Sequence, residues 1–220
     1  MRNTCWLLFV AVLVCGGALL WWVFMTTHYP VEGFYVARSM IPDKDALGGF
    51  SKRGNYPRDL AGQDWGKAGT VSLIAFPDER ASWRNLRGFA VRLVNRTDKP
   101  VAFRACDSCL YLVQEALDRD GNWRAIETLP REICGHSFHH VFLDEDQYWE
   151  FPAPHYSGLF KTRMRFRLDM GQDKLWLEGD SPECGKRGVW FPRPDGQVMY
   201  SNEFEGSINT SQFVPLRDTE

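Results

Sequence analysis

The residues from Cys5 to Met25, CWLLFVAVLVCGGALLWWVFM, form an apolar run without a charged side chain. An α-helix rises about 1.5 Å per residue, so a run of this length spans a hydrocarbon core of roughly 30 Å. Trp21 and Trp22 stand near its end, where indole rings favour the membrane interface. The run therefore predicts a transmembrane helix, and we assign residues 1–27 to an N-terminal anchor.

Two other uses of this run compete with a retained anchor. A cleaved signal peptide has small residues at the end of a shorter apolar stretch, but Gly16, Gly17 and Ala18 lie in the middle of the run. Attachment of a lipid to Cys15 normally requires a small residue before that cysteine, and Val14 occupies the position. Both comparisons favour a helix that is not cleaved.

The charge near the run predicts its orientation. Arg2 and the amino terminus lie on its short side, and no comparable basic cluster directly follows it. Positive residues concentrate on the cytoplasmic side, so the amino terminus is expected in the cytoplasm. We expect a single-pass protein of the cell membrane whose carboxy-terminal domain is extracytoplasmic, in a compartment where cysteines form disulfides.

The overall charge argues against one class of partner. The chain has 26 Lys and Arg residues against 28 Asp and Glu residues, which gives a formal net charge of -2. Nucleic-acid-binding proteins usually present a strongly basic surface, because phosphate contacts supply their non-specific affinity. We therefore expect no nucleic-acid partner.

Residues 28–68 contain many Gly, Pro and charged residues and have no sustained apolar period. We interpret them as an irregular stalk or as an extended arm laid across the following domain. Aromatic residues argue against full disorder, because disordered segments are usually poor in them. They are Phe34, Tyr35, Phe50, Tyr56 and Trp65.

Residues 69–220 form the main domain, in which apolar and polar residues alternate over short runs that predict strands. The connections agree, because NRTDKP has turn composition and Asp120-Gly121 is typical of a hairpin turn with positive φ. No run in this part predicts a helix of ten residues. We expect a mainly β domain, an antiparallel β-sandwich. The predicted strands cover residues 70–76, 88–95, 100–105, 109–117, 122–127, 138–143, 147–151, 161–169 and 174–178.

Four stretches of this domain are similar to a known class of protein: NRTDKPVAF, DGNWRAIE, FKTRMRFRLD and YSNEFEGSIN. Together with the anchor, they resemble the immunoglobulin-like or fibronectin-like β-sandwiches that are attached to bacterial envelopes. The resemblance covers residues 70–213 and departs from antibody domains, because no widely spaced Cys…Trp…Cys framework is present. It implies an immunoglobulin-like architecture, and no functional residue carries over from it.

The run KTRMRFRLD shows the clearest alternation. In a strand, its Thr, Met, Phe and Leu residues face the core while its cations form a row on the other face. That row is a candidate docking stripe for anionic glycan, phosphate or lipid headgroups. We favour the alternative of a solvated face whose charges are offset by Glu115 or Glu127 on a neighbouring strand. The row consists of Lys161, Arg163, Arg165 and Arg167.

Four cysteines follow the anchor: Cys106, Cys109, Cys134 and Cys184. They allow three complete pairings, and the sequence alone does not choose among them. Our preference is a tight Cys106–Cys109 bridge together with a Cys134–Cys184 bridge. A bridge of the longer kind stabilises a fold by roughly 3–4 kcal/mol.

The same region offers a metal site as an alternative. If residues 134–140 are extended, Cys134, His136 and His140 share one face, and Cys106 and Cys109 can complete a tetrahedral site. Thiol redox chemistry is less favoured, because a redox Cys-x-x-Cys motif normally opens a helix and a predicted strand follows here.

Catalytic signatures are missing from the sequence, which has no Walker loop, dinucleotide fingerprint or zinc-protease helix. We expect a non-enzymatic, membrane-anchored binding or structural module of the cell envelope that uses no cofactor. Its expected partners are the membrane, through the N-terminal helix, and an envelope protein or glycan. The alternative function is a metal-binding or thiol-redox accessory protein that uses the Cys/His cluster.

Overall fold

The computed structural model describes residues 31–39, 54–129, 138–170 and 198–215. Strands and their connections make up this part of the chain, together with a 3-10 turn at Thr210–Gln212. The predicted mainly β, antiparallel class is confirmed. The predicted anchor, residues 1–27, lies outside the described ranges. Within those ranges, no helix has the length and apolar character needed to cross a membrane.

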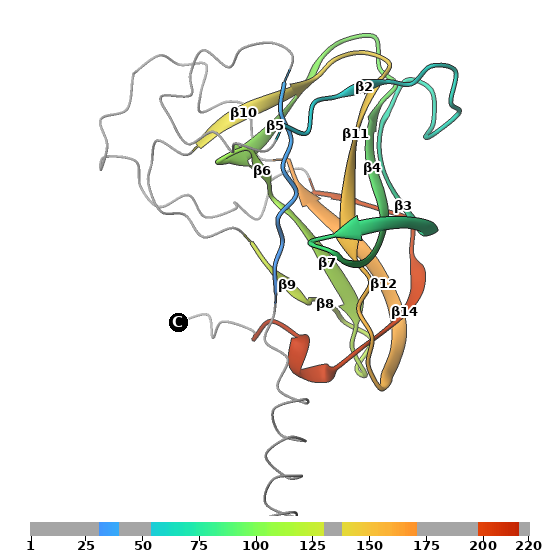
Figure 1. Cartoon of the computed structure of the whole chain (residues 1–220), viewed down its shortest axis with the longest axis vertical. Coiled ribbons are helices and arrows are strands. Elements are labelled where there is room, and N and C mark those ends of the chain that lie inside the picture. Colours follow the sequence, from blue (N-terminus) through green and yellow to red (C-terminus); the bar gives the residue numbers. More distant parts are fainter. Residues whose placement is uncertain (1–30, 40–53, 130–137, 171–197, 216–220) are drawn as a thin grey trace, which may run out of the picture.

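The first sheet is antiparallel, and β11 and β4 form its centre (Figure 1). Cross-strand partners lie on the same face of a sheet, so the register that aligns Leu73 with Leu93 and Trp149 places all three on the core side. The neighbouring residues in these strands, among them Arg92 and Glu150, face outward. In spatial order the strands are β2 (Arg58–Asp59), β11 (Gln147–Pro154), β4 (Leu86–Asn95) and β3 (Val71–Trp83).

The second sheet is built around β12. Met164, Phe166 and Leu168 of this strand are buried, while the intervening residues are more exposed, as the alternation in the sequence predicted. The β7–β8 hairpin turns at the predicted position, where Gly121 has a φ of 83°. The strands are β13 (Val198–Tyr200), β12 (Phe160–Asp169), β7 (Leu112–Leu117) and β8 (Trp123–Ala125), and β14 (Phe204–Ile208) also pairs with β12.

Two smaller sheets complete the described strands. One is antiparallel, with the order β10 (Phe138–Leu143), β5 (Val101–Cys106) and β6 (Cys109–Leu110). The other is a short parallel pair between β1 (Val31–Glu32) and β9 (Glu127–Thr128). The second pair joins the start of the described chain to its middle.

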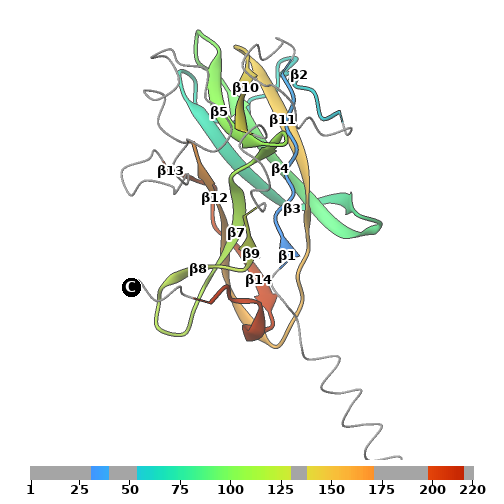
Figure 2. The same cartoon turned by 90° about the vertical axis from the view of Figure 1, so that its left-hand side faces the viewer.

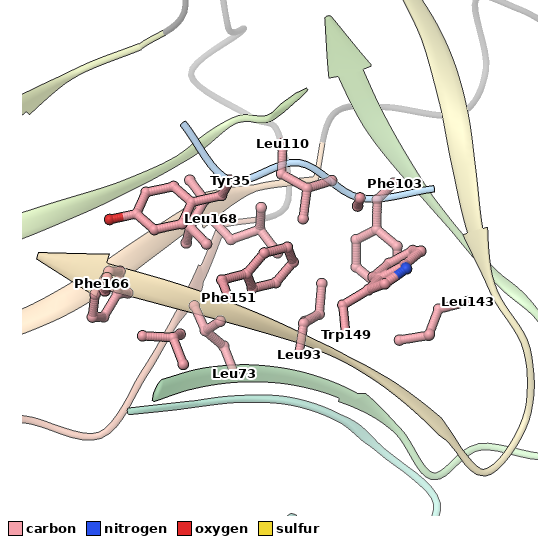
Figure 3. Close-up of a cluster of buried hydrophobic side chains, with 14 of the residues drawn as sticks. Tyr35, Leu73, Leu93, Phe103, Leu110, Leu143, Trp149, Phe151, Phe166 and Leu168 are labelled. Carbon is pink, nitrogen blue, oxygen red and sulfur yellow. The ribbon is translucent and has the colours of Figure 1, made fainter. Parts of the chain in front are cut away.

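The main hydrophobic core lies between the first sheet and the strands of the other sheets (Figure 3). Leu93 of β4 and Trp149 of β11 contribute from the first sheet, while Phe166 of β12 and Phe103 of β5 contribute from the opposite side. The Phe103 and Trp149 rings meet edge to face, with centroids 5.6 Å apart. Full burial of each large apolar side chain stabilises the fold by roughly 1.5–3 kcal/mol. This main core therefore joins sheets that are separate in their hydrogen bonding.

The described parts of the predicted arm pack on this core. Tyr35 and Ala37 belong to the core cluster, and Leu60 is also buried. The indole Nε1 of Trp149 donates a hydrogen bond of 2.9 Å to the carbonyl oxygen of Arg38. The folded unit therefore includes residues that the sequence assigned to the arm.

One hairpin is longer than the sequence predicted. The alternation ended at residue 76 and resumed at residue 88, whereas β3 continues to Trp83 and β4 begins at Leu86. A register shift between Phe76 and Arg80 absorbs the segment around Pro77, which lacks the N–H that a regular ladder needs. Beyond this bulge the pairing continues to the turn. The predicted strand at 174–178 lies outside the described residues.

Candidate functional site

The two described cysteines lie opposite each other at the β5–β6 hairpin. Cys106 and Cys109 are cross-strand partners, and the turn between them places Asp107 and Ser108 at φ values of 48° and 65°. No disulfide joins the two cysteines, so the preferred Cys106–Cys109 bridge is not found. Directly opposed residues of antiparallel strands have Cβ atoms about 4.5–5.5 Å apart. The mean Cβ–Cβ distance in a disulfide is shorter, about 3.8 Å.

The environment of Cys109 disfavours thiolate chemistry. Burial raises the pKa of the Cys109 thiol to about 12, and the neighbouring Cys106 and Asp107 raise it further in the same direction. Reactive cysteines have a lowered pKa, because the thiolate is the nucleophile. Burial and the raised pKa therefore argue against a redox role for Cys109. Cys134 and Cys184 lie outside the described residues, so a Cys134–Cys184 bridge stays a prediction.

The predicted metal ligands are only partly described. His140 pairs with Arg104 across the β10–β5 ladder, whereas the residue opposite Cys106 is Phe138. His140 is therefore offset from Cys106 by two residues along the strand, or about 7 Å. Within the described ranges, no group of three or more His, Cys, Asp or Glu side chains could hold a metal ion. Cys134 and His136 lie outside those ranges, so the complete set remains a prediction.

The cationic row on β12 meets carboxylates of its own sheet and of the adjoining loop. Glu115 of β7 is almost fully buried and pairs with Arg165 at 2.9 Å and with Arg167 at 3.4 Å, as the sequence predicted for this residue. Arg163 pairs with Glu203 at 2.7 Å. Glu127, the other predicted partner, lies on β9 and binds tyrosines instead. The row is therefore largely compensated in charge.

Arg165 lies between two aromatic rings on this outer face. Its guanidinium carbon is 4.2 Å from the centroid of Trp123 on β8 and 3.8 Å from that of Tyr200 on β13. Such contacts attract the cation to the ring face and hold it in place. Tyr200 remains 47% exposed, and Val198 on the same strand is 43% exposed. We call the surface made by Trp123, Glu115, Arg165, Tyr200 and the rest of the cationic row the outer face of β12.

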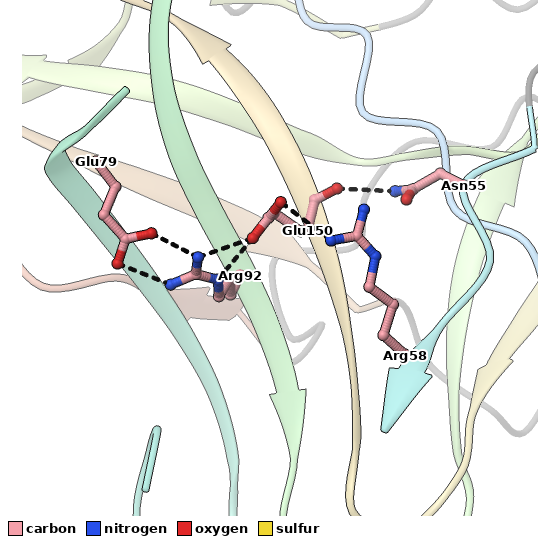
Figure 4. Close-up of polar contacts among 5 residues, drawn as sticks. All are labelled: Asn55, Arg58, Glu79, Arg92 and Glu150. Atoms are coloured by element: carbon pink, nitrogen blue, oxygen red, sulfur yellow. Dashed lines mark hydrogen bonds and ion pairs between the residues drawn. The ribbon is translucent and has the colours of Figure 1, made fainter. Parts of the chain in front are cut away.

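A second arginine, Arg92, also contacts aromatic rings, but it is nearly buried and pairs with two carboxylates (Figure 4). The guanidinium carbon of Arg92 lies 4.0 Å from the ring centroid of Trp65 and 4.4 Å from that of Phe76 on the outer side of the first sheet, and the Arg92 side chain is only 7% exposed. Glu79 and Glu150 both pair with it. Burial opposes the charge, but the hydrogen bonds that Arg92 donates to these carboxylates raise its pKa. Through Arg92, this cluster holds Trp65 and its loop against the first sheet.

A buried carboxylate lies near the start of the described chain. Glu127 is 2% exposed and accepts hydrogen bonds from the hydroxyls of Tyr35 and Tyr156, each at 2.9 Å. The backbone N–H of Gln114 donates a third, at 2.8 Å. Burial raises the pKa of Glu127 to about 7, although these hydrogen bonds lower it. Burial and the adjacent Glu127 raise the pKa of both tyrosines, so their hydroxyls remain donors.

The cavity beside this carboxylate is too small for an organic ligand. Its volume is about 10 Å³, and Gln114, His155 and Tyr156 are among its lining residues. A space of this size corresponds to about one water molecule. The Glu127 cluster therefore has a structural role. It joins separate segments of the chain, and the charge state of Glu127 depends on pH.

A basic hairpin tip, residues 80–87, ends the β3–β4 pair. Arg80, Arg84 and Arg87 are exposed, and none of them forms an ion pair with a described residue. Leu86 is 62% exposed and stands opposite Trp83 in the ladder. The tip thus combines three cations with an apolar pair and contains no acidic residue.

The hairpin tip and the Glu127 cluster were not identified from the sequence as sites. A signal for the tip is present in RASWRNLR, which has three arginines, a tryptophan and no acid. No local pattern marks Glu127, because Tyr35 is 92 positions away in the chain.

Comparisons with protein-family models, curated proteins and solved structures found no match to this chain. The described fold and its surfaces therefore define only a broad class, a mainly β protein with antiparallel sheets around a main hydrophobic core.

Proposed function

We propose that the chain is a non-enzymatic binding module of the cell envelope. In this proposal residues 1–27 form a single-pass anchor in the cell membrane, and an immunoglobulin-like β-sandwich is held outside the cytoplasm. The sandwich binds an envelope glycan on the outer face of β12. The ring-stacked Arg165 between Trp123 and Tyr200 is the observation that carries the proposal.

The short connection to the predicted anchor supports a domain held at the membrane. The apolar run ends at Met25, and the described domain begins at Val31 with β1. Tyr35, four residues later, is already in the core. Antiparallel sheets on both sides of the main core support the sandwich architecture.

The chemistry of the outer face of β12 favours a glycan over a polyanion. Its four cations face three carboxylates, Glu115, Glu203 and Glu205, so its charge is close to balanced. The exposed ring of Tyr200 offers an apolar face for a sugar ring and a hydroxyl that can form hydrogen bonds. Strand register and Glu115 hold the arginine and the rings in position, so little order must be gained on binding.

Co-sedimentation of the full-length, detergent-solubilised chain with insoluble peptidoglycan, used as the glycan probe, tests this proposal. Tyr200→Ala is expected to lower the affinity about five-fold, because a ring contact of this kind contributes about 1 kcal/mol. Tyr56→Ala is the matched control, since Tyr56 is also 47% exposed and also lies against an arginine, Arg38, but on another surface. Equal sedimentation of wild type and Tyr200→Ala would overturn the glycan assignment.

Protease treatment of intact spheroplasts tests the topology separately. The proposal expects cleavage of the domain beyond residue 27 without lysis, with the N-terminal segment retained in the membrane pellet. Protection of the whole chain until lysis would contradict an extracytoplasmic domain.

A further inference from the structure

The β3–β4 hairpin projects from the body of the domain (Figure 2). Its turn residues Arg84 and Asn85 have φ values of 46° and 66°, the conformation of a two-residue turn whose twist matches that of its strands. Trp83 and Leu86 are the last cross-strand pair before this turn. The basic hairpin tip is therefore an ordered extension of the first sheet.

The side chains of the tip have the composition of a membrane-interface element. Its three arginines are exposed, and they surround an apolar pair in which Leu86 is 62% exposed. Interfacial segments combine Lys or Arg, which meet anionic headgroups, with Trp or Leu, which enter the boundary of the acyl chains. Because no carboxylate of the described residues pairs with these arginines, their charge is available for an external anion.

The tip also lies close in space to the part of the chain that leads to the predicted anchor. The guanidinium of Arg84 lies 5.7 Å from the ring centroid of Phe34 and 4.7 Å from that of Trp83. Phe34 follows the end of the apolar run, Met25, by nine residues, which span at most roughly 30 Å when fully extended. The anchor therefore keeps the tip within reach of the headgroup layer.

We infer that the basic hairpin tip docks on anionic phospholipid headgroups of the membrane that holds the anchor. This inference rests on the membrane anchoring proposed above. The arginines supply the attraction to phosphate, and Trp83 with Leu86 supplies an apolar contact at the interface. The hairpin belongs to a different sheet from β12, so docking fixes the orientation of the domain without using the outer face of β12.

Hydrogen exchange of the full-length chain in vesicles tests the inference. The chain is reconstituted in vesicles of phosphatidylcholine alone and in vesicles with one third phosphatidylglycerol, and exchange of the peptide covering residues 80–87 is measured by mass spectrometry. We expect exchange at least five-fold slower in the anionic vesicles. Raising NaCl from 0.05 M to 0.5 M is expected to remove the difference, because salt screens headgroup attraction.

A pair of double variants separates local docking from net charge. Arg80→Gln with Arg87→Gln is expected to abolish the protection, since each basic residue near an anionic surface contributes about a five-fold effect. Lys99→Gln with Arg119→Gln removes the same charge from two other exposed turns and is expected to retain it.

The failures of the two proposals can be told apart by vesicle flotation. A chain that floats with both vesicle types but leaves the tip unprotected in both contradicts the docking while leaving the anchor intact. A chain that floats with neither contradicts the anchor and the docking together. Equal protection in both lipids would assign the tip to an apolar contact and would also overturn the anionic partner.

Discussion

The hydroxyl of Tyr35 donates a hydrogen bond of 2.9 Å to the buried carboxylate of Glu127, across 92 positions of sequence. Tyr156 donates a second hydrogen bond to the same carboxylate. Three separate segments therefore meet at one ionisable group: the start of the described chain, β9 and the loop after β11. Because the group is buried, its charge state affects how firmly these segments are held together.

The first prediction concerns the pH dependence of stability. The pKa of Glu127 is raised from 4.5 to about 7 by burial, so the folded state binds the proton more tightly than the unfolded state. This group's contribution is therefore fully present below pH 4.5 and is lost as the pH rises through 7. Between pH 5 and pH 8, the unfolding free energy of Glu127→Gln should therefore fall by about 2.5 kcal/mol less than that of wild type, measured by urea denaturation.

Two further variants check that assignment. Glu145→Gln removes an exposed carboxylate and should keep the wild-type pH dependence. Tyr35→Phe removes a donor that lowers the pKa of Glu127, so it should move the loss of stability to higher pH. A Glu127→Gln protein with the same pH dependence as wild type would show that this carboxylate does not titrate in the range.

The second prediction compares the nearly buried Arg92 with Arg163, which forms an exposed ion pair. Arg92→Ala removes a nearly buried cation that contacts both Trp65 and Phe76, and it leaves Glu150 without its closest partner. We expect a loss of about 2–4 kcal/mol in unfolding free energy. Arg163→Ala breaks an exposed pair with Glu203 and should change stability by less than about 1 kcal/mol. Equal losses in chemical denaturation would contradict a structural role for the Arg92 cluster.

The third prediction concerns Cys109. Its buried thiol, with a pKa raised to about 12, should react with iodoacetamide at pH 8 at least 100-fold more slowly in the folded protein than in urea. Mass spectrometry of the peptide after denaturation without reductant checks the pairing as well. Alkylation of Cys109 in urea without reductant would support an unbridged thiol. Alkylation only after reduction would show that Cys109 is in a disulfide.

Much of the strand pattern could be predicted from the sequence, because side-chain alternation and turn chemistry are local properties. The buried and exposed residues of β12 follow the alternation of KTRMRFRLD, and the β7–β8 hairpin turns at Gly121. Glu115 was also predicted as a partner of the cationic row, because a strand face needs compensation from a neighbouring strand.

Only the tertiary structure decided which distant residues meet. The burial of Glu127, the stacking of Arg165 between Trp123 and Tyr200, and the opposed but unbridged Cys106 and Cys109 all depend on strand register. Register is set by packing of the whole core, and a shift of one residue would move every side chain of a strand to its other face. The hairpin tip was also not predicted from the sequence. The bulge after Phe76 lets the ladder continue to the turn. The local sequence therefore determined the strands, and the assembled core determined the surfaces that they present.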